Sequence, residues 1–281
     1  VLLDSYGGTY RNATVGDGRL TAFINYEIGE DKRPGAGDLF RIVLADTQDQ
    51  PTLIRFADGI VRIWARFGRH RGITTPAGQI TLDLDRLDVN QLVHIAAADA
   101  EPMPGRISGT LNLYGMPREM TRTSGLGTVR ITDSDLANYD VFAFLYERMN
   151  VLNWGRDKPQ NRGHGSADLR FEADTLYVNN IRYFNRGTEI RATTTIHEVW
   201  KLPDSPIEGT AAGSVRPFSA LRLPLLADVD DVLNVLQQDV LPVRISGTVR
   251  HPRVELVPFS EISGAMRSLL LGDVQEETRG R

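Results

Sequence analysis

The chain has 281 residues, and its 32 lysines and arginines against 36 aspartates and glutamates give a formal net charge of −4 at pH 7. With 41% hydrophobic and 24% charged residues, the composition is that of a folded globular protein and excludes a disordered one. The absence of cysteine excludes disulfides, thiolate metal sites and cysteine nucleophiles, and the near-neutral charge argues against a nucleic-acid-binding protein.

Most of the chain alternates between apolar and polar residues. Successive side chains of a strand point to opposite faces of a sheet, so such runs predict strands with one apolar and one polar face. Buried parallel strands would instead be continuously apolar, so we expect an antiparallel sheet built from local hairpins and meanders. The alternating runs are Gly59–Phe67, Ile80–Asp85, Ile107–Leu113, Val129–Thr132, Ala167–Ala173, Ile190–Ile196 and Val243–Val249.

Three segments have the spacing of an amphipathic helix instead. Apolar residues recur at steps of three and four in residues 134–154, where Asp133 or Ser134 could serve as the N-cap. The same spacing predicts a second helix over residues 219–241 and a shorter third one over about 260–271.

Proline and glycine mark the ends of these elements and one internal boundary. Pro242 directly follows the second predicted helix, which it cannot continue. The loop Ala100–Gly105 contains two prolines and a glycine and separates a region that we expect to be purely β from one that mixes strands and helices. We therefore predict three regions: an amphipathic β-repeat segment at 1–100, a mixed region at 101–272 and a polar tail at 273–281.

A short sequence recurs within the chain. Arg106-Ile-Ser-Gly-Thr-Leu111 is repeated as Arg244-Ile-Ser-Gly-Thr-Val249, and both copies are expected to open an alternating strand. Looser relatives begin at Gly125 and Gly163. Either the sheet is extended by repeated units, or these glycines simply mark loops.

No catalytic or metal-binding motif is found, and no cofactor is expected. The five histidines are scattered without metal-ligand spacing, and no serine lies in a Gly-x-Ser-x-Gly sequence. Asp83 and Asp85 are expected on the polar face of a strand, whereas Asp133 and Asp135 suit the start of a helix. These positions favour structural roles over calcium binding or paired-carboxylate hydrolysis.

One basic cluster has two interpretations. It comprises Arg62 and Arg66 on the polar face of a predicted strand, with Arg69, His70 and Arg71 in the turn that follows. It is either the solvated end of a hairpin or a surface that attracts anionic lipid headgroups.

After residue 105, the order of the predicted elements resembles the C-terminal region of the AsmA-like family of bacterial envelope proteins. Gly125–Leu145 is similar to the family's glycine-opened strand, turn and leucine- and aromatic-rich helix, except that Tyr139-Asp140 stands where an apolar helix start is common. Residues 167–192 are similar to its paired meander, and Leu241–Val254 matches its closing pattern of Gly-Thr between hydrophobic residues followed by proline. The resemblance covers about two-thirds of the chain.

The resemblance implies a mainly β protein with a few α-helices, in which a curved, groove-like, repetitive antiparallel sheet carries amphipathic helices packed on its apolar face. It also implies a periplasmic protein of the bacterial cell envelope, tethered to the inner membrane by an N-terminal helix outside this chain. Members of the family are linked to phospholipid transport and to outer-membrane assembly.

Three functional hypotheses follow. In the first, the chain is not an enzyme and binds phospholipid or another acyl-chain lipid in an apolar β-groove, where burial stabilises each methylene by about 0.8 kcal/mol. In the second, it is a structural or interaction scaffold with a closed core, and in the third, a carbohydrate-active enzyme with two converging carboxylates. The apolar positions expected to face lipid are Val61, Ile63, Leu82, Leu111, Leu113, Val129, Ile131, Leu169 and Phe171.

Overall fold

The structure is a computed structural model that describes residues 2–4, 7–10, 13–27, 39–44, 51–69, 77–96, 102–116, 119–135, 143–145, 148, 162–185, 188–214 and 240–258. Within residues 2–44 the description covers the backbone. The strands are β1 (Leu2–Asp4), β2 (Gly7–Tyr10), β3 (Ala13–Glu27), β4 (Leu39–Leu44), β5 (Thr52–Phe56), β6 (Gly59–Arg69), β7 (Ala77–Asp88), β8 (Arg106–Met116), β9 (Glu119–Ser134), β10 (Gly163–Glu172), β11 (Thr175–Asn185), β12 (Thr188–Ile196), β13 (Ile207–Ser214), β14 (Val240–Gly247) and β15 (Pro252–Leu256).

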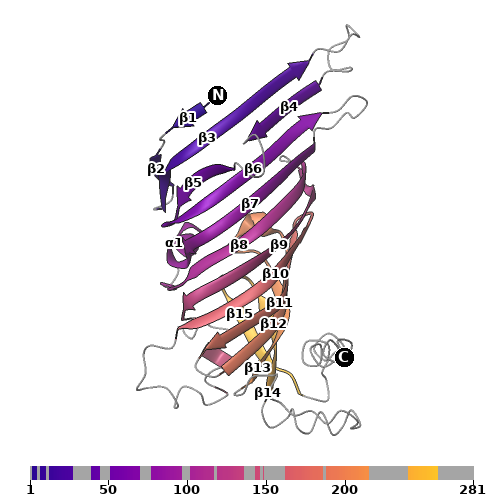
Figure 1. Ribbon diagram of the computed structural model, residues 1–281. Helices are drawn as coiled ribbons and strands as arrows, with labels where there is room; N and C mark the ends of the chain where they lie inside the picture. Colours follow the sequence, from indigo (N-terminus) through magenta and orange to yellow (C-terminus); the bar gives the residue numbers. More distant parts are fainter. Residues whose placement is uncertain are drawn as a thin grey trace, which may run out of the picture. The chain divides into compact units, whose positions relative to one another are not determined.

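Across these ranges, fifteen strands form one antiparallel sheet (Figure 1). The strand order is β1-β3-β4-β6-β7-β8-β9-β10-β11-β12-β13-β14-β15; β2 also pairs with β3, and β5 pairs with β3 and β6. Most strands therefore pair with their neighbours in sequence, as expected for hairpins and meanders. The predicted fold class, a mainly β protein with an antiparallel sheet, is confirmed.

The predicted alternation is clearest in β10. Gly163, Gly165 and Ala167 are buried, and the polar residues between them are exposed. Farther along the strand, Leu169 and Phe171 are partly buried between exposed charged residues. The period-two pattern in the sequence therefore does place apolar and polar side chains on opposite faces.

Three described strands contain a non-glycine residue with left-handed backbone conformation: Arg86 in β7, Asp133 in β9 and Asn180 in β11, with φ of 55°, 54° and 50°. At Arg86 the register with β8 shifts between Leu84 and Leu87, as in a β-bulge, so that both leucines lie on the same face.

Asp133 shows a matching pattern of burial. Thr132 and Asp133 are both exposed and Ser134 is buried, so the alternation in β9 also shifts by one residue there. Such a shift keeps apolar side chains on their original face. Asn180 also has left-handed backbone conformation, and the three residues are equally spaced along the chain.

The chain divides into two compact units, described separately here. Unit 1 consists of Val1–Arg130 and Leu169–Leu176, and unit 2 of Ile131–Asp168 and Tyr177–Arg281. These units are defined by compactness, and their bounds do not correspond to the regions predicted from the sequence. The regions 1–100, 101–272 and 273–281 therefore stay predictions.

Unit 1 contains a helix that contradicts the expectation of a purely β region before residue 100. Helix α1 (Val89–Ala96) directly follows β7, and the Asp88 carboxylate accepts a hydrogen bond from the backbone N–H of Gln91 at 3.0 Å, which caps its first turn. Val89 is buried, and Leu92 packs against the apolar residues of the sheet. The helix is only two turns long, too short for a clear helical period in the sequence.

The first predicted helix is confirmed in part. Residues 143–145 are helical, and Leu145 is fully buried in the core of unit 2, so this segment packs on the apolar face of the sheet as expected. Ser134 is not its N-cap, because it ends β9 and its hydroxyl donates to the Gly163 carbonyl at 3.3 Å. Most of the remaining residues of 134–154 lie outside the described part of the chain.

The end of the second predicted helix is wrong. Val240 and Leu241 begin strand β14, and Pro242 lies buried within that strand rather than after a helix. The Pro242 carbonyl accepts a hydrogen bond from the backbone N–H of Val257 at 3.1 Å, so the run is stabilised as a strand. Residues 215–239, and the third predicted helix and the tail at 259–281, lie outside the described residues.

The repeated hexapeptide does not mark equivalent positions. The copy at 106–111 opens β8, but in the copy at 244–249 the strand β14 ends at Gly247, which has φ of +97°. Gly125 lies inside β9 and Gly163 begins β10, so neither marks a loop. A Cβ atom at Gly125 would come within 2.6 Å of the Asn112 carbonyl, so this glycine permits close approach of β8 and β9.

The core of unit 2 is closed on the apolar face. Its buried members come from the helical segment at 143–145 and from β11 to β14, and Ile131 packs against them. The buried members are Leu145, Tyr183, Ile190, Ala192, Ala211, Val243 and Ile245.

The opposite face of unit 2 is also buried around β12, which contradicts the expectation of a polar, solvated face there. The side chains of Glu189 and Arg191 are 2% and 6% exposed and form an ion pair with 2.8 Å between Oε1 and Nε. Both residues lie opposite buried residues of β13, Ser214 and Ala212. The alternation predicted which residues share this face but not that the face is covered.

Removing one partner of this pair is expected to destabilise unit 2 strongly. Glu189→Gln removes the carboxylate that lies 2.8 Å from the buried Arg191 guanidinium, and we expect the free energy of unfolding to fall by about 3–5 kcal/mol in urea denaturation followed by circular dichroism. The double variant Glu189→Gln/Arg191→Met should recover most of this loss.

An exposed pair with the same spacing provides the control. Arg170 and Glu172 lie 3.2 Å apart on β10 with side chains 47% and 51% exposed. Glu172→Gln should cost about 1 kcal/mol at most. Equal losses for Glu189→Gln and Glu172→Gln would contradict the role assigned to the buried pair.

Candidate functional site

The register of β6, β7 and β8 in unit 1 assigns their side chains to two distinct faces. Ile63 lies opposite Leu82, which in turn lies opposite Leu111 on β8. One position away, Arg62 lies opposite Asp83, which lies opposite Thr110. Antiparallel partners share a face, so these strands have one aliphatic and one polar surface.

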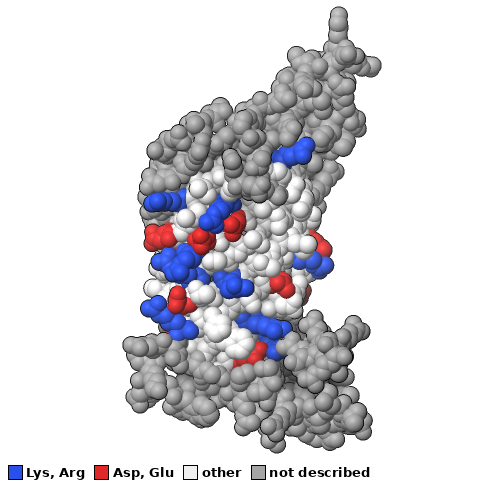
Figure 2. All heavy atoms as spheres, in the orientation of Figure 1, with Lys and Arg blue, Asp and Glu red and all other residues white. Residues whose placement is uncertain are grey.

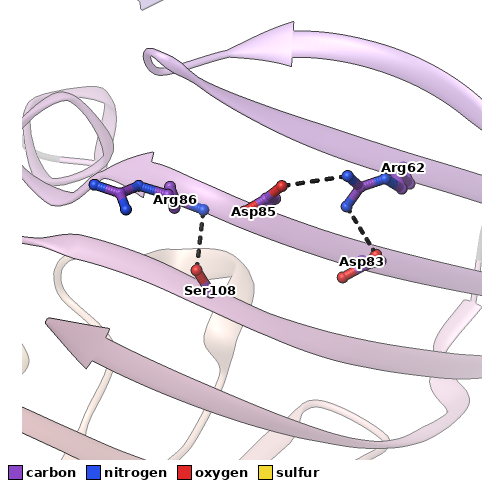
Figure 3. A network of polar contacts seen from close by, with 5 residues as sticks. All are labelled: Arg62, Asp83, Asp85, Arg86 and Ser108. Carbon is purple, nitrogen blue, oxygen red and sulfur yellow. Dashed lines mark hydrogen bonds and ion pairs between the residues drawn. The ribbon is translucent and has the colours of Figure 1, made fainter.

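The polar face is held together by contacts between strands. Charged side chains gather over this part of the sheet in Figure 2, and Figure 3 shows the guanidinium of Arg62 between two carboxylates. Its Nη1 lies 3.0 Å from Asp83 Oδ2 and its Nη2 lies 3.2 Å from Asp85 Oδ2. Partial burial lowers the pKa of Arg62, but the hydrogen bonds and charges of Asp83 and Asp85 outweigh this effect and raise it.

Neutral side chains continue the same pattern across β7, β8 and β9. Thr81 donates to Asn112 Oδ1 at 2.8 Å, and the hydroxyls of Thr110 and Thr128 lie 3.5 Å apart. At the bulge, the backbone N–H of Arg86 donates to the Ser108 hydroxyl at 3.0 Å (Figure 3). The polar face is thus a set of paired cross-strand contacts.

This arrangement favours a structural interpretation of the basic cluster over the attraction of headgroups. The charge of Arg62 is matched by two carboxylates, so it is not presented alone to an anionic partner. Arg66 is exposed on the same face. The side chain of Arg69 and residues 70 and 71 lie outside the described part of the structure.

The aliphatic face of unit 1 is covered at one end. There, Val61 and Leu87 are buried together with Ala57, and Ile63 and Leu82 pack against them. Helix α1 contributes Leu92 to the same cluster and so covers the end of the face that lies next to the bulge of β7.

Farther along the strands, the aliphatic side chains keep part of their surface accessible. Ile80 lies opposite Leu113, and both, like Leu111, are partly exposed and lie outside the cluster under α1. We call the residues Ile63, Ile80, Leu82, Leu111 and Leu113 the apolar strip. Because every member comes from a paired strand, the strip presents side chains while its backbone groups are hydrogen bonded within the sheet.

The structure brings together five of the nine predicted site residues. Val61, Ile63, Leu82, Leu111 and Leu113 share one face of unit 1. Val129 continues it on β9, since a Cβ at Gly109 would meet the Val129 Cα at 3.0 Å. Val129 is therefore the neighbour of Gly109, whose own β7 partner is Leu84 on the same aliphatic face.

The remaining predicted site residues have other surroundings. Ile131 is partly buried and packs against the core of unit 2. Leu169 and Phe171 are partly buried on β10 and belong to unit 1. The alternation in the sequence predicts which apolar side chains point to the same face of a strand. It does not predict which of them are buried by other parts of the chain.

Sequence reasoning missed the residues that close one end of the strip. Ala57 lies in the turn between β5 and β6, and Val89 and Leu92 belong to α1. The available signal was Asp88 followed by Val89, Leu92 and Ile95, an N-cap residue before apolar residues spaced by three.

The described histidines and carboxylates make local contacts. Among them, no group of three or more histidine, aspartate or glutamate side chains is arranged to hold a metal ion. His94 contacts the Asn90 carbonyl at 2.8 Å, His197 contacts Glu208 at 3.2 Å, and His164 stacks on Phe184. These histidines therefore occur singly in local contacts.

Comparison of the chain with protein-family models, with curated proteins and with solved structures finds no match to any of them. None of the helices in the described ranges is long and apolar enough to span a bilayer. The functional argument therefore depends on the geometry of the two faces of unit 1.

Removal of the Arg62 guanidinium tests whether its ion pairs with Asp83 and Asp85 stabilise unit 1. In Arg62→Met the two carboxylates of β7 face each other without a cation, and we expect a loss of about 0.5–1 kcal/mol in the free energy of unfolding. Because salt screens exposed charges, the loss should shrink as sodium chloride is raised. The variant Arg62→Met/Asp83→Asn/Asp85→Asn should show no such salt dependence, and a salt-independent loss in Arg62→Met would contradict the pairing.

Proposed function

We propose that unit 1 binds an acyl-chain lipid, such as a phospholipid, on its apolar strip, and that the chain has no catalytic role. The observation that carries the proposal is the partial exposure of five aliphatic side chains on one face of β6, β7 and β8. No charged residue is among the members of this strip, whereas the opposite face holds the ion pairs of Arg62.

The chemistry of the strip suits a hydrocarbon chain. Isoleucine and leucine side chains offer dispersion contacts and no hydrogen-bonding groups, and burial of a ligand there gains about 0.8 kcal/mol per methylene. Ile80 and Leu82, two residues apart on β7, point to the same face and extend the apolar contact along this strand.

The proposal is also in line with the resemblance of residues 106–254 to the AsmA-like family. We extend it to a place in the bacterial periplasm, in a protein tethered to the inner membrane and engaged in phospholipid transport or outer-membrane assembly. The geometry supports only the lipid contact, and this wider setting depends on the resemblance.

A second candidate function is favoured for unit 2. Its apolar face is packed with its own side chains, and Glu189 and Arg191 are buried on the other face. A closed body of this kind suits a structural or interaction scaffold, so the two units would divide lipid contact and support between them.

A charge placed in the apolar strip is expected to abolish lipid binding. Protein purified without detergent should carry phospholipid detectable by mass spectrometry, and Leu111→Glu should reduce the bound amount at least about tenfold, because a carboxylate in an acyl-chain contact is strongly unfavourable. Asn112→Glu, on the opposite face of the same strand, is the matched control and should retain lipid.

Thermal unfolding would show that both variants are folded, and the smaller change Leu111→Ser provides a second test should the glutamate prevent folding. Absence of phospholipid from the wild-type protein, or equal retention by Leu111→Glu and Asn112→Glu, would overturn the proposed function.

A further inference from the structure

Two loops of unit 2 form a compact tip with exposed apolar side chains. One loop, residues 197–206, joins β12 to β13 and contains the short 3-10 turn η3 (Val199–Lys201). The other, residues 248–251, joins β14 to β15. The Val249 N–H donates to the Ser205 carbonyl and the Arg250 N–H donates to the Pro203 carbonyl, both at 3.0 Å. We call these two loops the tip.

The first loop is also fixed from within. The Lys201 N–H donates to the Glu198 carbonyl at 2.8 Å, and the Ser205 hydroxyl donates to the same carbonyl at 2.8 Å. The Asp204 N–H donates to the Lys201 carbonyl at 2.9 Å. Backbone groups that are paired in this way can enter an apolar medium without the cost of breaking their contacts with water.

Two large apolar side chains project from this fixed backbone. Trp200 is 50% exposed and Leu202 is 46% exposed. Their neighbours Lys201 and Arg250 are long cationic side chains, paired with Glu198 at 2.8 Å and with Asp204 at 3.5 Å.

We propose that the tip docks unit 2 onto a lipid bilayer by inserting Trp200 and Leu202 into the interfacial region. Tryptophan favours this region because its ring is apolar and its N–H can remain hydrogen bonded, and lysine and arginine can reach from it back to water. The exposed apolar surface of two side chains is far smaller than the roughly 800 Å² that each partner contributes to a stable protein interface. Binding to a bilayer scales with the apolar area inserted, so two side chains would give weak and reversible binding.

The charges of the tip point to insertion rather than to electrostatic adsorption. Lys201 and Arg250 are each matched by an acid of the same tip, so the described charges balance formally. Binding should therefore occur on phosphatidylcholine vesicles and change little when phosphatidylglycerol is included. The inference does not depend on lipid binding by the apolar strip, which belongs to unit 1.

Vesicle flotation of the full chain tests the proposal. The double variant Trp200→Ser/Leu202→Ser should partition onto phosphatidylcholine vesicles at least about tenfold less than the wild-type protein, since it removes two side chains that gain from leaving water. The matched control is Tyr114→Ser/Leu126→Ser, whose side chains are 47% and 62% exposed in unit 1, and it should bind as the wild type does.

A second measurement locates the contact directly. The chain has no cysteine, so Leu202→Cys and Leu126→Cys can each carry a polarity-sensitive fluorophore without further substitutions. Vesicles should shift the emission of the label at 202 to shorter wavelength and leave that at 126 unchanged.

The outcomes separate this proposal from the proposed function. Wild-type protein that does not float, a tip variant that floats like wild type, or equal loss in the tip and control variants would each overturn bilayer docking by the tip. Co-purified phospholipid should be the same in wild type and tip variant, so failure of lipid binding in unit 1 leaves the flotation result unaffected.

Discussion

The structure depends on one geometric constraint, the alternation of side chains between the two faces of a paired strand. In an antiparallel ladder the residues directly opposite each other share a face, so a single strand's parity is transmitted to all its neighbours. Ile63, Leu82 and Leu111 are aligned across three strands by this rule alone. The same rule collects Arg62 and its two aspartates on the other side of unit 1.

The two units use this constraint differently. Unit 1 leaves aliphatic side chains partly accessible beyond α1, whereas unit 2 buries its apolar face and, around β12, the polar face as well. Replacement of a buried charged pair such as Glu189 and Arg191 by apolar residues is often close to neutral, whereas removal of one partner is costly because it leaves a buried charge uncompensated. The strands of both units have the same alternating pattern. The apolar strip of unit 1 and the buried core of unit 2 therefore differ in what packs on each face.

The sequence contained the information for the fold class and for most strands, because a period of two is directly visible in runs such as 59–67 and 167–173. It could not predict burial, since coverage of a face depends on distant residues: Ile131, predicted to face lipid, is partly buried against the core of unit 2. Pro242 was taken for the end of a helix because local rules favour that position for proline, yet strand pairing on both sides of β14 outweighs the local preference. Helix α1 was missed because eight residues give little periodic signal.

The equal spacing of Arg86, Asp133 and Asn180 has a consequence for how such a sheet can change in length. At Arg86 and Asp133 the alternation shifts by one residue, so the stretch from one to the other is a module that returns the apolar side chains to the same side. Duplication of one whole module would lengthen the sheet and leave its existing faces intact. Loss of a single residue within a strand would instead exchange interior and exterior for the rest of that strand, so evolution of this architecture is expected to proceed in modular steps.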